Sequence, residues 1–121
     1  MFEELMVQVL VVDDEEDKRT ELSSALALRG FDVDSVDSAG ASERVRDSQP
    51  PIAIVDLMLH GTTGFELARK LREDAPGTRV ILTSEYHFSQ TQLEKADCGA
   101  IAFVPRPFAV DELSEFLRSK L

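Results

Sequence analysis

Five short apolar runs alternate with stretches of helical periodicity along this chain. The runs are rich in β-branched residues, and three of them (VQVLVV, IAIVD and VILTS) are almost wholly apolar, as is typical of parallel strands covered on both faces. The predicted strands are Val7–Val12, Asp32–Val36, Ile52–Asp56, Arg79–Thr83 and Ala100–Val104.

A helical stretch follows each predicted strand. The first places Leu22, Ala25 and Leu26 at helical spacing and is followed by Gly30, a residue type that is common just past a helix end. Five strand–helix units in one chain predict an α/β fold built on a doubly wound, five-stranded parallel sheet. The predicted helices are Glu15–Arg29, Ala39–Asp47, Thr63–Glu73, Ser89–Lys95 and Val110–Lys120.

Composition narrows the class of protein. The chain has 121 residues, of which 43% are hydrophobic and 30% are charged, as in ordinary soluble globular domains. We expect a single domain over residues 1–121, because no linker or low-complexity tract divides the chain. Lys and Arg number 13 against 23 Asp and Glu, a net charge of −10, which argues against a nucleic-acid backbone as a partner of this domain.

The sequence also predicts where the protein acts. Cys98 is the only cysteine, so an internal disulfide is excluded. No apolar run approaches the ~20 residues of a membrane span, and the start MFEELM is acidic, unlike a signal peptide. We therefore expect a cytoplasmic protein that has no membrane partner.

Five carboxylates follow the first strand without a break, in VVDDEED. Like charges at this density repel one another, so something must offset them. Glu15, Glu16 and Asp17 fall in the first turn of the predicted helix, where the helix dipole favours negative charge. Asp13 and Asp14 end the strand itself and need a separate explanation.

The predicted sheet places these two carboxylates beside other polar side chains. In open α/β sheets the functional crevice lies at the carboxyl ends of the strands, next to the point where the strand order reverses. Asp56 ends the third strand, Thr83 ends the fourth, and Arg106 follows the fifth. We expect these residues to converge with Asp13 and Asp14 on one rim of the sheet.

Each rim residue has a simpler interpretation when it is taken alone. Asp13 or Asp14 would cap the helix, and Asp56 would be a solvated loop carboxylate. Thr83 would be an ordinary strand residue, and Arg106 a surface cation. Capping uses only one aspartate, however, and three carboxylates at one point would raise one another's pKa unless a cation intervened. Mg²⁺ prefers such oxygen ligands, so the convergence favours a Mg²⁺ site.

The chain resembles a response-regulator receiver domain of two-component signalling over essentially its whole length. The matching segments are VLVVDDEE, IVDLMLHGTTGFEL, VILTS and GAIAFVPRPF, in the order and spacing of that family. The resemblance implies a flavodoxin-like (βα)5 fold with strand order 2-1-3-4-5. It also implies that Asp56 accepts a phosphoryl group from a sensor histidine kinase or a histidine phosphotransfer protein, in an aspartyl-phosphate switch rather than a turnover enzyme.

The resemblance further implies the ligands of the metal ion. Asp14, Asp56 and the backbone carbonyl of Met58 would bind Mg²⁺ directly, and Asp13 would help through water.

The resemblance also implies the parts that move. Thr83 would be the hydroxyl that shifts toward the phosphoryl oxygens, and Phe103 would stand at the aromatic switch position. The face built from the fourth helix, the fifth strand and the fifth helix would contact an effector domain or downstream protein, or form a homodimer.

Two positions depart from that family. Arg106 stands where the family normally has lysine, and His60 stands where it normally has proline. The planar fork of arginine cannot reproduce the contacts of a compact ammonium group. The alternative is therefore a pseudo-receiver that works as a phosphorylation-independent protein-interaction module. The resemblance also implies a cis Arg106–Pro107 peptide bond. From the chemistry of arginine we expect a charge-assisted hydrogen bond from Arg106 to Asp56 or Asp13.

Overall fold

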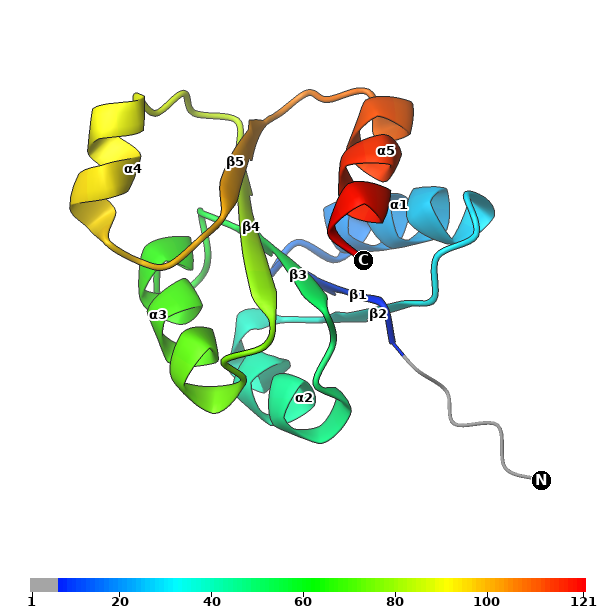
Figure 1. Ribbon diagram of the computed structural model, residues 1–121, viewed down its shortest axis with the longest axis horizontal. Helices are drawn as coiled ribbons and strands as arrows, with labels where there is room; N and C mark the ends of the chain where they lie inside the picture. Colours follow the sequence, from blue (N-terminus) through cyan, green and yellow to red (C-terminus); the bar gives the residue numbers. More distant parts are fainter. Residues whose placement is uncertain (1–6) are drawn as a thin grey trace.

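The computed structural model describes residues 7–121, and the acidic start MFEELM lies outside the described residues. The strands form one parallel sheet in the order β2-β1-β3-β4-β5 (Figure 1). The predicted doubly wound fold and its strand order are thereby confirmed. The strands are β1 (Val9–Val12), β2 (Val33–Val36), β3 (Ile52–Asp56), β4 (Arg79–Ser84) and β5 (Ala102–Pro105).

Helices cover both faces of the sheet. Figure 1 shows α1 and α5 together on one face and α2, α3 and α4 on the other. In the part of the chain that the structure describes, no helix is long and apolar enough to cross a membrane. The helices are α1 (Glu16–Leu28), α2 (Ala41–Ser48), α3 (Gly64–Asp74), α4 (Gln90–Ala96) and α5 (Val110–Lys120).

The sheet separates two hydrophobic cores, because successive side chains of a strand point to opposite faces. In β1, Val9 and Val11 belong to the core that includes α1 and α5 residues. Leu10 and Val12 belong to the core that includes α2 and α3 residues. All four side chains are at most 1% exposed, so burial on both faces explains the continuous apolar run.

The start of α2 differs from the prediction. Residues Ser38–Gly40 form a short 3-10 helix, and the Asp37 side chain accepts a hydrogen bond from the Gly40 N–H at 3.0 Å. The α-helix begins only at Ala41, so the predicted start at Ala39 is two residues early. The reason is that the Asp37 cap closes a tighter turn before the regular helix begins.

Gly64 lets α3 begin in direct contact with the end of β3. A Cβ atom at this position would lie 2.7 Å from the Asp56 carbonyl oxygen and 2.7 Å from the Leu57 Cα atom. The Gly64 N–H donates to the Leu57 carbonyl at 2.8 Å, and the Thr63 hydroxyl caps the helix by accepting from the Glu66 N–H at 3.2 Å. The glycine therefore fixes the path of the backbone that follows Asp56.

The helix α4 is held more loosely than its neighbours. Within the described chain, none of its residues is buried. Its C-terminal end is fixed by Arg69 of α3, which donates to the carbonyl oxygens of Ala96 and Asp97. A cavity of about 300 Å³ lies between α4 and β5. Few buried contacts make α4 the helix whose position is easiest to change.

Candidate functional site

The strand ends bring the predicted polar residues to one rim of the sheet. Asp13 and Asp14 follow β1, Asp56 is the last residue of β3, and Arg106 follows β5. Thr83 of β4 is the direct neighbour of Asp56 in the parallel ladder. Neighbouring strands lie about 4.8 Å apart, so the Thr83 side chain stands next to the Asp56 carboxylate.

Asp56 combines burial with access to a cavity. The residue is only 5% exposed, and its Oδ1 atom accepts a hydrogen bond from the Met58 N–H at 2.9 Å. Among the described residues, no donor is bonded to its second oxygen. The cavity that Asp56 enters has a volume of about 180 Å³ and is lined by Glu15, Lys18, Asp56, Met58, Glu85 and Tyr86.

Asp13 is buried more deeply, at 1% exposed. Its Oδ1 atom accepts from the Glu15 N–H at 2.9 Å, whereas its buried Oδ2 atom has no hydrogen-bond partner in residues 7–121. Burial raises the pKa of Asp13 to about 6, the Glu15 hydrogen bond opposes this rise, and the charge of Asp56 adds to it. Asp13 therefore lacks the second hydrogen-bond donor that a fully ionised carboxylate needs in this place.

Arg106 is the cation that faces the unpartnered Oδ2 atom of Asp13, and its main-chain geometry agrees with the prediction. The Arg106–Pro107 peptide bond is cis, which confirms the expectation. The Arg106 Nη2 atom lies 3.6 Å from Asp13 Oδ2, which makes an ion pair but is too long for a hydrogen bond. The expected charge-assisted hydrogen bond is therefore wrong. The guanidinium also lies over the Phe108 ring, 5.5 Å from its centroid, and this contact competes for the same group.

Both carboxylate oxygens of Asp14 accept hydrogen bonds from other residues of the chain. Its Oδ1 atom accepts from the Ser38 N–H at 2.7 Å, and its Oδ2 atom accepts from the Ser38 hydroxyl at 2.8 Å and the His60 N–H at 2.7 Å. Burial is the largest single influence and raises the pKa of Asp14, but these hydrogen bonds together outweigh it, so that the pKa is lowered. Asp14 is thus ionised and satisfied without a metal ion.

The two residues that the resemblance marks as moving parts lie in different surroundings. Thr83 is 1% exposed, and its hydroxyl has no hydrogen-bond partner among the described residues. A buried hydroxyl without a partner is costly and requires an explanation. Phe103 packs edge to face on Phe88 with a centroid distance of 5.7 Å, and Phe88 packs in the same way on Phe65 at 5.8 Å. These rings link β5 to α3 through the segment before α4.

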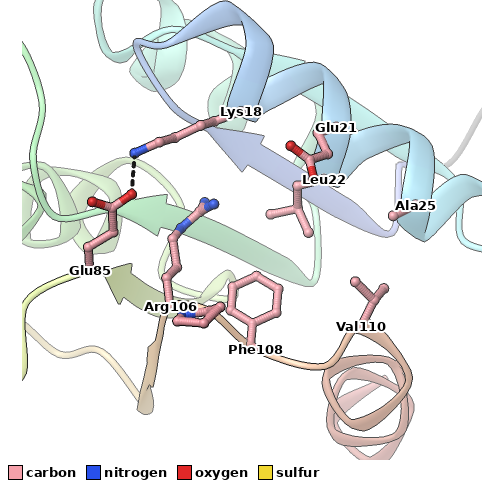
Figure 2. Close-up of a pocket in the computed structure, with 9 residues that line it drawn as sticks. Lys18, Glu21, Leu22, Ala25, Glu85, Arg106, Phe108 and Val110 are labelled. Atoms are coloured by element: carbon pink, nitrogen blue, oxygen red, sulfur yellow. Dashed lines mark ion pairs between the residues drawn. The ribbon is translucent and has the colours of Figure 1, made fainter.

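A larger cavity of about 580 Å³ lies between α1 and the segment that follows β5 (Figure 2). Lys18 forms ion pairs with Glu85 at 3.1 Å and with Glu15 at 3.6 Å, and Figure 2 marks the first of these. Lys18 and Glu85 line both cavities, so their ion pair lies where the two meet. Lys18 was not identified from the sequence, although its place in the first turn of α1, next to the rim, is a signal that could have found it.

The rim contains oxygen atoms that could bind a divalent cation, but they are not arranged as a complete metal site. In residues 7–121, no group of three or more His, Cys, Asp or Glu side chains could hold a metal ion. The unpartnered Asp13 Oδ2 atom and the Asp56 carboxylate fit a cation. Asp14 fits only after a change, because its oxygens already accept three hydrogen bonds. Met58 is 58% exposed and lines the smaller cavity beside Asp56.

Known proteins are similar to this chain in sequence and in fold. The model of the response regulator receiver domain family matches residues 9–118. The regulatory protein AtoC of Escherichia coli is 30% identical over 115 residues, which cover 94% of this chain and 25% of AtoC. The chain spans about half the length of the other curated relatives that we compared with it.

Solved structures agree with the sequence comparison. The chemotaxis protein CheY4 of Vibrio cholerae has a TM-score of 0.84 at 24% identity, covering 96% of this chain and 99% of CheY4. The response regulator TrrA of Thermotoga maritima, solved in complex with Mg²⁺ and BeF, has a TM-score of 0.81 at 27% identity, covering 93% of this chain and 97% of TrrA. The match of the family model and the shared fold show that the chain belongs to the response regulator receiver domain family, the signalling domains of two-component systems.

Proposed function

We propose that this receiver domain is a phosphorylation switch in which Asp56 accepts the phosphoryl group. The observation that carries the proposal is that two polar groups on neighbouring strands lie side by side and each has an oxygen atom that lacks a hydrogen-bond partner in residues 7–121. Asp56 reaches a cavity with one oxygen free of protein donors, and the buried Thr83 hydroxyl beside it lacks a partner. A phosphoryl group on Asp56 would offer acceptor oxygens to this hydroxyl.

The proposed reaction is a simple phosphoryl transfer. An oxygen of the Asp56 carboxylate forms a bond to phosphorus while the bond from phosphorus to the donor breaks. With a phosphohistidine donor the imidazole nitrogen leaves with the bonding electron pair, and with acetyl phosphate the leaving group is acetate. Both reactants are anionic, so cations that face the entering oxygens lower the barrier. Lys18 and Arg106 are the cations that the chain itself supplies around Asp56.

We propose Mg²⁺ as the cofactor, held by Asp14, Asp56 and the Met58 backbone carbonyl, with Asp13 assisting through water. When bound, the ion would neutralise the carboxylates and the phosphoryl oxygens. The unpartnered Asp13 Oδ2 atom supports this assignment, because it is a buried acceptor that lacks a positive neighbour at hydrogen-bond distance.

The phosphodonor would be a sensor histidine kinase or a histidine phosphotransfer protein. The target would be an effector domain, a downstream protein or a second copy of the chain, bound at the face of α4, β5 and α5. Low burial of α4 and the aromatic contacts of Phe103 support this face as the one that responds. We propose a cytoplasmic domain that contacts no membrane and no nucleic acid, with no turnover chemistry beyond its own phosphotransfer and dephosphorylation.

Mass spectrometry with a small phosphodonor tests the assignment of Asp56. Incubated with acetyl phosphate and Mg²⁺, the wild-type chain is expected to gain the mass of one phosphoryl group. Asp56→Asn is expected to gain none, since an amide cannot form the acyl phosphate. Asp47→Asn, which changes an exposed aspartate of α2, is the control and should gain the full mass. An equal gain in Asp56→Asn would remove the proposal.

The competing function is the pseudo-receiver. Two observations favour it: Arg106 is engaged by Asp13 and Phe108, and Asp14 is already satisfied by the protein. A pseudo-receiver would keep its fold and gain no phosphoryl group in the wild type under the same conditions.

A further inference from the structure

The Asp14 carboxylate joins three segments that are distant in the sequence. It follows β1, while Ser38 opens the short helix before α2 and His60 lies between β3 and α3. Ser38 contributes two donors, at 2.7 Å and 2.8 Å, and the His60 N–H contributes a third at 2.7 Å. Asp14 thus connects the segment that follows Asp56 to the segment that follows β2.

These donors compete with any metal ion at the same carboxylate. Two ionised oxygens offer about four lone-pair sites, and three of them are used. Oδ2 already accepts two hydrogen bonds and Oδ1 accepts one, so a cation that binds through Oδ2 must displace a donor. Hydrogen bonds from N–H groups to a carboxylate are short and strong, so their loss weakens metal binding by the same amount that they stabilise the metal-free state.

His60 is the main-chain donor that a single substitution, to proline, can remove. Its hydrogen bond comes from the main chain, so every residue except proline supplies it. The sequence has histidine at the position where receiver domains normally have proline, which carries no N–H group. The His60 N–H is therefore an addition of this chain.

We propose that the hydrogen bond from His60 to Asp14 Oδ2 is a latch on the metal site, and that Mg²⁺ binds through this oxygen by taking the place of the His60 N–H. The inference rests on the proposed function, because Mg²⁺ has to be a ligand of this rim. The latch makes Mg²⁺ binding weaker than the same carboxylates would otherwise allow. It also couples binding to the segment between Asp56 and α3, because His60 is released when Asp14 turns to the metal.

A pair of substitutions at one position separates the N–H group from the side chain. The full chain and its His60→Pro and His60→Ala variants are titrated with Mg²⁺ at pH 8. His60→Pro lacks the donor, and we expect it to bind Mg²⁺ about tenfold more tightly than the wild type. His60→Ala retains the donor and is expected to bind as the wild type does. Asp14→Ala should weaken binding by at least about tenfold.

A second measurement does not depend on the proline variant being folded. Hydrogen exchange of the His60 amide is followed in the wild type with and without saturating Mg²⁺. The latch predicts a protected amide in the metal-free chain and faster exchange when Mg²⁺ is bound. Ser38→Ala, which removes only the hydroxyl donor, is the control and should leave the His60 amide protected before metal is added.

The outcomes distinguish a failure of the latch from a failure of the proposed Mg²⁺-dependent function. Equal affinity in His60→Pro and His60→Ala, or unchanged protection of the His60 amide at saturating Mg²⁺, would overturn the latch and leave the metal site in place. No Mg²⁺ binding in any variant would overturn both the latch and the Mg²⁺-dependent function.

Discussion

Asp13 is the site residue whose burial most clearly destabilises the folded protein. A carboxylate that is 1% exposed normally has several hydrogen bonds or a close cation, whereas Asp13 Oδ2 has only the Arg106 guanidinium at 3.6 Å. Burial and the neighbouring Asp56 charge raise its pKa to about 6. Such an acceptor destabilises the resting fold and is ready for a cation or a donor that arrives during function.

The raised pKa of Asp13 predicts how stability depends on pH. Between the ordinary value of 3.8 and about 6, the folded state binds more protons than the unfolded state. The free energy of unfolding therefore falls as the pH rises through this window. Asp13→Asn cannot ionise, so above pH 6 we expect it to be more stable than the wild type, by at most about 3 kcal/mol.

Urea unfolding from pH 4 to pH 7, with a chelator present, checks this expectation. The difference between Asp13→Asn and the wild type should be small at pH 4 and should grow toward pH 6. Asp47→Asn, at an exposed site, should follow the wild type throughout. A difference between Asp13→Asn and the wild type that does not change with pH would contradict the assignment of the raised pKa to Asp13.

At the scale of elements, the site depends on how α3 meets the end of β3. Gly64→Ala would place a Cβ atom 2.7 Å from the Asp56 carbonyl oxygen, a contact that only a backbone shift relieves. We expect a loss of about 1–3 kcal/mol in the free energy of unfolding, together with slower phosphorylation of Asp56. Gly77→Ala, whose Cβ atom would meet nothing within 4 Å, is the matched control and should leave both quantities nearly unchanged.

Chemical denaturation and the rate of acetyl phosphate labelling measure the two effects. A Gly64→Ala variant with wild-type stability and rate would show that the approach of α3 to β3 has no role in holding Asp56.

The strands and the rim could be predicted because they depend on local patterns. β-Branched apolar runs define the five strands, and the residues that follow a strand end reach the same edge whatever the loops do. Asp13, Asp56 and Thr83 were identified in this way. The cis Arg106–Pro107 bond came from the family resemblance, because chemistry alone makes such a bond uncommon.

The partners of the rim residues could not be predicted, because they come from loops and from side-chain packing. Nothing in the sequence indicates that Ser38 and His60 converge on Asp14, since both lie in connections whose paths depend on tertiary structure. The predicted hydrogen bond from Arg106 failed because the Phe108 ring also contacts the guanidinium. Lys18 was missed because a lysine in the first turn of a helix is most often solvated.

At the scale of the whole molecule, the rim and the proposed output face are connected through β4, β5 and the aromatic side chains. Phe103 contacts Phe88, which lies in the segment that leads into α4. A phosphoryl group that draws the Thr83 hydroxyl or Arg106 would shift these strands relative to α4. An equilibrium moves only by the difference in contacts between its two states, so the way Arg106 is held limits the response.

Replacing the arginine should enlarge the response. Arg106→Lys loses the guanidinium contact with the Phe108 ring, and a compact ammonium group can follow a new anion more freely. We expect larger amide shifts at Phe103 and in α4 on addition of beryllofluoride than in the wild type. Phe108→Leu, which removes the ring and keeps the arginine, should change the response in the same direction. An Arg106→Lys variant with no larger shifts would mean that the arginine is merely tolerated.

The most direct test of the proposed phosphorylation switch compares backbone amide spectra of the wild-type chain with and without Mg²⁺ and beryllofluoride. Beryllofluoride would mimic the phosphoryl group that we propose on Asp56. The switch predicts shifts at Asp56 and Thr83 that continue through Phe103 into α4. Shifts confined to the rim, or no shifts at all, would contradict the switch and leave the pseudo-receiver as the function of this domain.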